Sequence, residues 1–456
     1  MRLHAFNSET GSWQRRTSRR GGMSVWMILA MGVLLAALAL AVDGAYLWMA
    51  KAEMRNAADS IALATAQALL RDEVLSNRPE AMWKTAQLAY QEAVRYGQAN
   101  PVLGQPLELV FDAGDPESGD VIFGYRESPQ DRSFQAAVDL GDVNINAVRV
   151  IARRTRQRGN PAGMFFGRVL GLPAADVVAS ATAYLDRDVI GFRPVGNRSI
   201  PLAPIALLSD PTQGKSLAWE TQTLGPLQEG ASDAADRFTF DPVHRRFVEL
   251  DAGPEPGDGI YEMEVRLPLG QPTEPGEGHE EEFNACFVVI GHDANSSESL
   301  WSSLVRQFKQ GITAQDLAEM GGQIVLGEDN RVVLAGMPFG PLTEEIAGDS
   351  LFQVLDGLRQ SGEPRIWPLY STVARNRDGA TGWQVTIQGF VAARVVQVEK
   401  TPEAGSGGAA QPMLSFVLQP CQMAVNAAVT DSDRRYANPA FSIYNRYIAK
   451  VRLVNE

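Results

Sequence analysis

The stretch Met23–Val42 reads MSVWMILAMGVLLAALALAV, twenty residues without a charged side chain. As a helix it would be about 30 Å long, which is the thickness of the hydrocarbon core of a bilayer. Asp43 closes the run, and a basic patch precedes it, made of Arg15, Arg16, Arg19 and Arg20. Arginines on the short N-terminal side favour a cytoplasmic N-terminus. We therefore expect residues 1–22 to be a basic cytoplasmic tail, 23–42 a transmembrane helix, and the bulk of the chain extracytoplasmic.

A cleaved secretory signal is the alternative interpretation of this segment. The apolar core of such a signal is typically about 7–15 residues long and leads to a small-residue cleavage site. The run at 23–42 is longer and continues into a helical pattern without a turn. These two features favour a retained single-pass anchor.

The charge of the chain excludes some classes of function. The 456 residues include 41 Lys and Arg against 54 Asp and Glu, a formal net charge of −13. The tail 1–22 is basic, so the rest of the chain is more acidic than this average. Because nucleic-acid binding needs a basic face, no nucleic-acid partner is expected. Gly214-Lys215-Ser216 has the end of a phosphate-loop pattern, but Ser209 stands where that loop needs glycine, so no nucleotide is expected either.

Residues 43–99 show helical periodicity after the apolar run. Small apolar side chains recur every three or four positions in two seams, at Leu47, Ala50, Met54, Ala57, Ile61, Ala64 and Ala68 and at Met82, Ala86, Ala89, Ala93 and Tyr96. Pro79 suits the first turn of the second helix, and Gly97 and Pro101 suit its end. The pattern predicts a membrane-proximal antiparallel hairpin. Pairing of one seam with a helix of another protein is the alternative.

The N-terminal residues resemble the start of Tad-type (TadE/TadG-like) Flp pilus assembly proteins. The resemblance rests on Arg19–Gly22 before the apolar run, on the turn Ala41–Tyr46, and on the helix Glu53–Ala64 (EMRNAADSIALA), where polar Asn56 and Asp59 interrupt the alanines. It covers about the first 70 residues. It implies a bacterial inner-membrane anchor near a pilus machine, with the lipid bilayer and other pilus-assembly or envelope proteins as partners, the latter through the alanine-rich helix.

Longer TadG-like proteins tend to carry a von Willebrand factor A domain with an Asp-x-Ser-x-Ser metal motif. The nearest pattern here is Asp293, Asn295 and Ser297 after the apolar run Cys286–Gly291, with asparagine in place of the first serine. Helix capping is the favoured interpretation, because Asn and Ser are common caps. A metal-dependent adhesion module at these three residues is the alternative function.

The extracytoplasmic body is predicted to be α+β, with a small α+β domain at 100–190 and a larger β-rich domain with a few helices at 191–456. Alternating apolar residues predict a hairpin of 107–111 with 121–125, and strands near 143–152 and 176–185. A short helix is expected at 163–170. In the larger domain the pattern predicts strands near 261–267, 283–290, 324–326, 331–334, 383–388, 391–398, 413–419 and 447–454, and helices at 299–310 and 313–320.

No catalytic or cofactor motif stands out. The four histidines show no H-x-x-x-H spacing, and no G-x-S-x-G elbow occurs. The two cysteines, Cys286 and Cys421, either form a disulfide across a long loop or remain two buried thiols. We therefore expect a non-catalytic protein without a cofactor that acts through protein contacts. An extracytoplasmic hydrolase without a readable motif is a further alternative.

Overall fold

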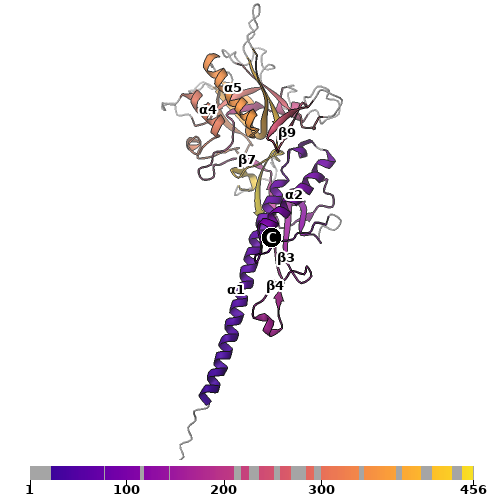
Figure 1. Ribbon diagram of the computed structural model, residues 1–456. Coiled ribbons are helices and arrows are strands. Elements are labelled where there is room, and N and C mark those ends of the chain that lie inside the picture. Colours follow the sequence, from indigo (N-terminus) through magenta and orange to yellow (C-terminus); the bar gives the residue numbers. More distant parts are fainter. Residues whose placement is uncertain are drawn as a thin grey trace, which may run out of the picture. The chain divides into compact units, whose positions relative to one another are not determined.

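The computed structural model describes residues 22–76, 78–112, 118–142, 144–209, 217–224, 236–250, 257–268, 284–291, 299–337, 344–375, 383–401, 413–433 and 444–454. The chain has one long N-terminal helix, few other helices and many strands, with a mainly-β C-terminal region (Figure 1). The predicted α+β class is confirmed. The chain divides into two compact units, the first Met1–Met54 with Arg153–Val178 and the second Arg55–Ala152 with Ala179–Glu456.

Helix α1 (Gly22–Ala68) is continuous over 47 residues, so the apolar run and the first seam belong to one helix. It is the indigo helix of Figure 1. In the described part of the chain, α1 is the one helix long and apolar enough to cross a membrane. Its apolar side chains point outward, with Ile28 at 72% and Leu38 at 61% exposure. This agrees with a segment whose natural surroundings are apolar.

A short 3-10 turn, η1 (Asp72–Ser76), follows α1 and leads to α2 (Pro79–Ala99). Pro79 occupies the first turn of α2, where its missing N–H costs nothing. Most of both predicted seams is buried, with full burial of Ala50, Met54, Ile61, Ala86, Ala89 and Ala93, whereas Leu47, Ala64, Ala68 and Tyr96 are half-buried. The intramolecular hairpin and pairing with a helix of another protein both stay predictions.

A six-stranded sheet follows α2, in the order β18-β20-β6-β3-β1-β2. Its strands are β1 (Val121–Tyr125), β2 (Gln135–Ala136), β3 (Ala147–Arg154), β6 (Val177–Asp186), β18 (Met423–Ala424) and β20 (Ile448–Val454). The hairpin predicted for 107–111 with 121–125 is wrong, because β2 and β3 occupy both edges of β1. Segment 107–111 forms no strand, and the Val110 N–H instead donates to the Asp120 carboxylate at 2.9 Å.

The last strand of the chain, β20, pairs antiparallel with β6, Lys450 lying opposite Asp186. The sequence placed 447–454 in the larger domain, whereas its hydrogen bonds place it in the sheet of β1, β3 and β6. The domain boundaries themselves stay a prediction.

The β-rich region is built on a seven-stranded sheet in the order β11-β17-β16-β14-β12-β8-β15. Its strands are β8 (Ile205–Leu208), β11 (Met263–Pro268), β12 (Ala285–Val289), β14 (Val332–Met337), β15 (Arg365–Arg375), β16 (Trp383–Thr401) and β17 (Met413–Pro420). Because β15 pairs both with β8 and with β16, five of these strands form a closed ring of pairings. Closure removes two free edges that would otherwise offer unpaired backbone groups.

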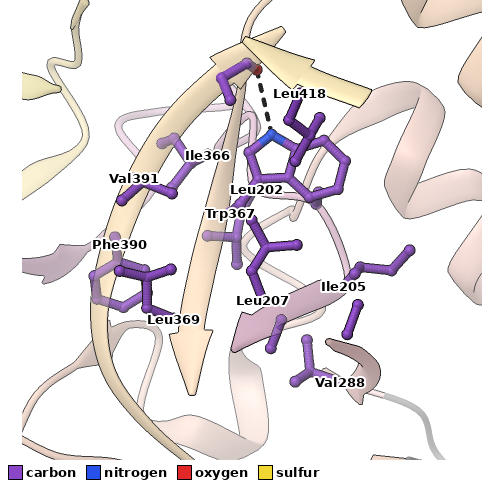
Figure 2. Close-up of a cluster of buried hydrophobic side chains, with 14 of the residues drawn as sticks. Leu202, Ile205, Leu207, Val288, Ile366, Trp367, Leu369, Phe390, Val391 and Leu418 are labelled. Atoms are coloured by element: carbon purple, nitrogen blue, oxygen red, sulfur yellow. Dashed lines mark hydrogen bonds between the residues drawn. The ribbon is translucent and has the colours of Figure 1, made fainter. Parts of the chain in front are cut away.

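Trp367 on β15 lies at the centre of the core of this region (Figure 2). It is fully buried, and its Nε1–H donates to the Ala393 carbonyl at 3.2 Å. Apolar side chains from β8, β12, β15, β16 and β17 surround it, among them Ile205, Leu207, Val288, Ile366, Leu369, Phe390, Val391 and Leu418. The core thus draws on strands far apart in the sequence.

Two helices belong to this region, α4 (Leu300–Gln310) and α5 (Glu344–Ser361), and α5 contacts both α4 and β16. Ser299 caps α4 by accepting the Ser302 N–H at 3.1 Å, as its side-chain chemistry predicts. The helix predicted at 313–320 is wrong except for a 3-10 turn, η4 (Ala318–Met320). Asp316 accepts hydrogen bonds from the backbone and side chain of Thr313, which compete with a helix.

Shorter elements complete the described chain. They are β4 (Ala162–Gly163), η2 (Gly167–Leu170), β5 (Ala174–Ala175), β7 (Val189–Phe192), α3 (Trp219–Thr223), β9 (Phe238–Asp241), β10 (Arg246–Glu249), β13 (Ile324–Val325), β19 (Ala428–Thr430) and η5 (Asp431–Asp433). The helix predicted at 163–170 is therefore wrong. Gly163 belongs to the short strand β4, and only residues 167–170 form a turn, the 3-10 turn η2.

Candidate functional site

Asp43 lies directly after the predicted span and is 2% exposed. Its two carboxylate oxygens accept the backbone N–H groups of Phe165, Phe166 and Gly167 at 2.6–3.2 Å. These amides stand at the start of η2, where a carboxylate satisfies N–H groups that lack partners in the turn. Asp43 therefore ties the loop 164–172 to α1 inside the first unit.

Further contacts hold the same loop. Strands β4 and β5 pair at its base, Ala162 opposite Ala175. The rings of Tyr46 and Phe165 meet edge to face with their centroids 5.0 Å apart. The Lys51 ammonium donates to the Val178 carbonyl. In the sequence, Asp43 marks the end of the apolar run and belongs to the turn Ala41–Tyr46, and no local pattern connects it with amides 122 residues away.

In the second unit, Asp72 of η1 connects the helical segment with the β-rich region. Its carboxylate forms an ion pair with Arg394 of β16 and accepts the Gln422 N–H at 2.7 Å. The Arg394 guanidinium also lies over the Phe240 ring, 4.1 Å from its centroid. Asp72 and Arg394 keep only 20% and 11% of their side chains exposed, so the pair is largely desolvated. Asp72 thus fixes the end of the α1–η1 segment to β16 and to the turn between β17 and β18.

A recess of about 470 Å³ opens in the β-rich region, and three hydrogen bonds join five of its lining residues. The Ser209 hydroxyl donates to the Glu220 carboxylate at 2.7 Å and accepts from the Gln388 amide at 2.8 Å. The Trp219 indole N–H donates to the Tyr447 hydroxyl at 3.2 Å. The described lining residues include no histidine beside Ser209, so this arrangement is a polar recess and not a Ser-His site.

Glu262 is a second buried carboxylate in this unit, 2% exposed. Burial raises its pKa to about 8, although the N–H groups of Arg237 and Phe238 favour its ionised form, and nearby Asp236 and Asp258 oppose ionisation further. Burial likewise raises the pKa of Asp258 to about 6. In the described part of the chain, no group of three or more His, Cys, Asp or Glu residues has an arrangement that could hold a metal ion.

Both cysteines are buried free thiols in the structure, and their pairing stays a prediction. Cys286 lies on β12 and Cys421 follows β17, and β14 and β16 stand between these strands in the sheet order. A disulfide needs Cα atoms within about 7 Å, whereas strands that are not neighbours are about 10 Å or more apart. Burial raises the pKa of both thiols above the usual range, that of Cys421 to about 12.

The predicted metal residues Asp293, Asn295 and Ser297 lie outside the described residues, as do residues 214–216 and the basic tail. The adhesion module therefore stays an untested alternative.

Together these features define a protein with one N-terminal apolar helix suited to membrane anchoring and an α+β body without a recognisable catalytic site among the described residues. Residues 21–68 match a family described as Flp pilus-assembly TadE/G-like. Residues 53–183 match a second family, described as Tad-like Flp pilus-assembly. No curated protein and no solved structure matches the chain.

The resemblance found in the sequence is thereby confirmed and reaches further than the first 70 residues. The two matches together cover residues 21–183, from the start of α1 to β6, which is more than a third of the chain. The β-rich region beyond lies outside both matches. These families support a role in pilus assembly.

Proposed function

We propose that this chain is a non-catalytic component of a Tad-type pilus assembly system, anchored in the bacterial inner membrane by α1. The N-terminus would lie in the cytoplasm and the body on the outer side. The observation that carries the proposal is the match of residues 21–183 to two Flp pilus-assembly families. The outward apolar side chains of α1 support the anchor, and the arginines before it support the orientation.

The proposed mode of action is contact with other pilus-assembly or envelope proteins through the alanine-rich part of α1. The seam at Met54 and Ile61 is buried in the chain, so the free face of the helix is the one that would meet a partner. Trp48, at 78% exposure, lies on that helix beside the start of the seam, six residues after the end of the apolar run at Val42. Tryptophan is enriched in protein interfaces because it buries a large area with few rotatable bonds.

Two experiments test the two parts of this proposal. Alkaline phosphatase and green fluorescent protein fusions at the C-terminus report orientation, and we expect phosphatase activity without fluorescence. Deletion of the gene should abolish surface pili, and the full-length chain should restore them. Trp48→Ala should reduce recovery of pilus proteins in cross-linked complexes, whereas Val243→Ala, at an exposed position of the body, should not. Pili that persist after deletion would contradict the assembly role, and a fluorescent fusion would contradict the topology.

A further inference from the structure

The loop between β4 and β5 carries a dense set of exposed apolar side chains. Residues 162–175 read AGMFFGRVLGLPAA, with Arg168 as the single charged residue. Five large side chains are exposed, Phe165 at 62%, Phe166 at 45%, Val169 at 85%, Leu170 at 64% and Leu172 at 56%. A contiguous patch of this kind on a short loop marks a surface with an apolar partner.

Hydrogen bonds within the first unit satisfy most of the backbone N–H groups of this loop, as an apolar environment requires. Asp43 accepts three of its N–H groups, and the loop satisfies others internally, with Met164 donating to Pro173, Val169 to Phe166, Gly171 to Arg168 and Leu172 to Gly167. Pro173 has no N–H to satisfy. Non-helical backbone enters lipid only where its polar groups are paired, so the buried carboxylate removes the main cost of placing this loop there.

The Asp43 contact also sets the depth of the loop. Asp43 directly follows the predicted span 23–42, so amides within 3.2 Å of its carboxylate lie at the C-terminal end of that span. Exposed Trp48 comes one and a half turns later in α1, and Lys51 is the next charged residue after Asp43. Tryptophan is typical of the membrane–water interface. The loop therefore lies at the level of the interface and not above it.

The charge beside the loop fits the same partner. Residues 153–178 of the first unit contain five arginines and one acidic residue, Asp176. Arg156 and Arg168 are exposed, Arg153 and Arg158 are half-buried, and Arg154 is buried. The rest of the chain is acidic overall. A basic segment next to an apolar tip is complementary to anionic lipid headgroups and acyl chains.

We propose that loop 164–172 inserts into the leaflet at the C-terminal end of the α1 span and forms a second membrane contact, clamped to the helix by Asp43. The partner is the lipid bilayer itself, not a protein. This inference rests on the proposed anchoring of α1. Two contacts restrain rotation and tilt of the helix, which a single span leaves free.

Depth-dependent quenching tests the inference on the full-length chain in nanodiscs of phosphatidylcholine and phosphatidylglycerol. An environment-sensitive fluorophore is attached to Val169→Cys, to Leu35→Cys in the span, or to Val243→Cys in the body, and the unsubstituted chain measures labelling of the two buried native thiols. Lipids with a nitroxide near the headgroup or near the chain end serve as quenchers. We expect Val169→Cys to be quenched most by the shallow nitroxide, Leu35→Cys by the deep one, and Val243→Cys by neither.

The outcomes separate this inference from the anchoring on which it rests. Quenching of Leu35→Cys without quenching of Val169→Cys overturns the inserted loop and leaves the anchor standing. Quenching at neither position contradicts the anchor as well. A blue-shifted but unquenched Val169→Cys signal means that a protein surface covers the loop, which also overturns the proposal. Adding Asp43→Asn should at least halve the quenching at Val169→Cys while Leu35→Cys stays unchanged; unchanged quenching at both positions overturns the clamp.

Discussion

The two compact units use apolar and charged side chains in opposite ways. In the first unit, Ile28 and Val169 point outward while the carboxylate of Asp43 is buried against backbone amides. In the second, Trp367 and Phe416 are buried and the apolar core is closed by strands. The same rule, that apolar groups leave water, produces both arrangements if the first unit has lipid as its surroundings. The comparison can be tested by substitutions with matched partners in each unit.

The largest effect is expected from truncating the core tryptophan. Trp367→Ala removes a fully buried side chain and its hydrogen bond to Ala393, and should lower the free energy of unfolding by about 3–5 kcal/mol. Trp48→Ala, at 78% exposure in the first unit, should change it by less than about 0.5 kcal/mol. Chemical denaturation of the detergent-solubilised chain measures both. Equal losses would mean that exposed apolar residues of the first unit are part of a packed core.

The next largest effect concerns the ion pair of the second unit. Asp72→Ala leaves Arg394, whose side chain is 11% exposed, without its carboxylate partner. Because an unpaired and largely desolvated charge is costly, we expect a loss of about 2–4 kcal/mol. Glu73→Ala breaks the neighbouring pair with Arg71, which is far more exposed, and should cost less than about 1 kcal/mol. If Asp72→Ala lowers the free energy of unfolding as little as Glu73→Ala does, then water reaches the Arg394 guanidinium and the ion pair is not desolvated.

A third prediction concerns the pH dependence that Glu262 gives the second unit. Its pKa is about 8 in the folded chain against an ordinary value near 4.5, so the folded state holds a proton that the unfolded state has lost between these values. The stability that Glu262 contributes is fully present below its ordinary pKa of 4.5 and is lost as pH rises to its folded-state pKa of about 8. Glu262→Gln should remove this decline and stabilise the chain at pH 8 by roughly 1–3 kcal/mol.

Glu264→Gln is the matched control for Glu262, since Glu264 lies two residues further along the chain, on β11, with a 41% exposed side chain. Its pH profile should follow that of the unsubstituted chain. A decline between pH 5 and 8 that survives in Glu262→Gln would show that another group titrates there.

The smallest effect is expected at Asp433, where the direction of the pH dependence is reversed. Burial alone would raise its pKa, but hydrogen bonds from Lys450 and the Thr430 N–H and the charge of Arg452 bring it down to about 2. Its stabilisation is therefore present above its ordinary value of 3.8 and is lost as pH falls to about 2. Asp433→Asn should cost about 1 kcal/mol at pH 7 and little at pH 2.

Asp139→Asn provides the control for Asp433, because Asp139 is exposed and accepts only a local N–H from Gly141 in the contacts described. Its loss at pH 7 should be near zero. A constant loss across pH 2–7 in Asp433→Asn would indicate a packing effect and not a charge effect.

Local pattern explains why some elements were predictable. The apolar run and the two seams have a helical period, and both follow from residue spacing alone. Strands β3, β6, β12 and β17 were close to their predicted positions for the same reason. Two separate strands were predicted at 383–388 and 391–398, but they form one continuous strand, β16, in which Gly389 lies opposite Leu369. Helix α5 and strand β15 were not predicted. Helix α4 was predicted at 299–310, but its capping was assigned to Asn295 and Ser297, whereas Ser299 caps it.

The sequence alone determined the long apolar helix, the fold class and the resemblance to pilus-assembly proteins, because each follows from composition or from residue spacing over a few turns. The tertiary structure decided which distant groups meet: Asp43 binds the amides of Phe165–Gly167, Asp72 pairs with Arg394, and β20 pairs with β6. These contacts join residues tens to hundreds of positions apart. Which distant groups meet depends on how the strands are ordered and closed, and periodicity carries no record of that order.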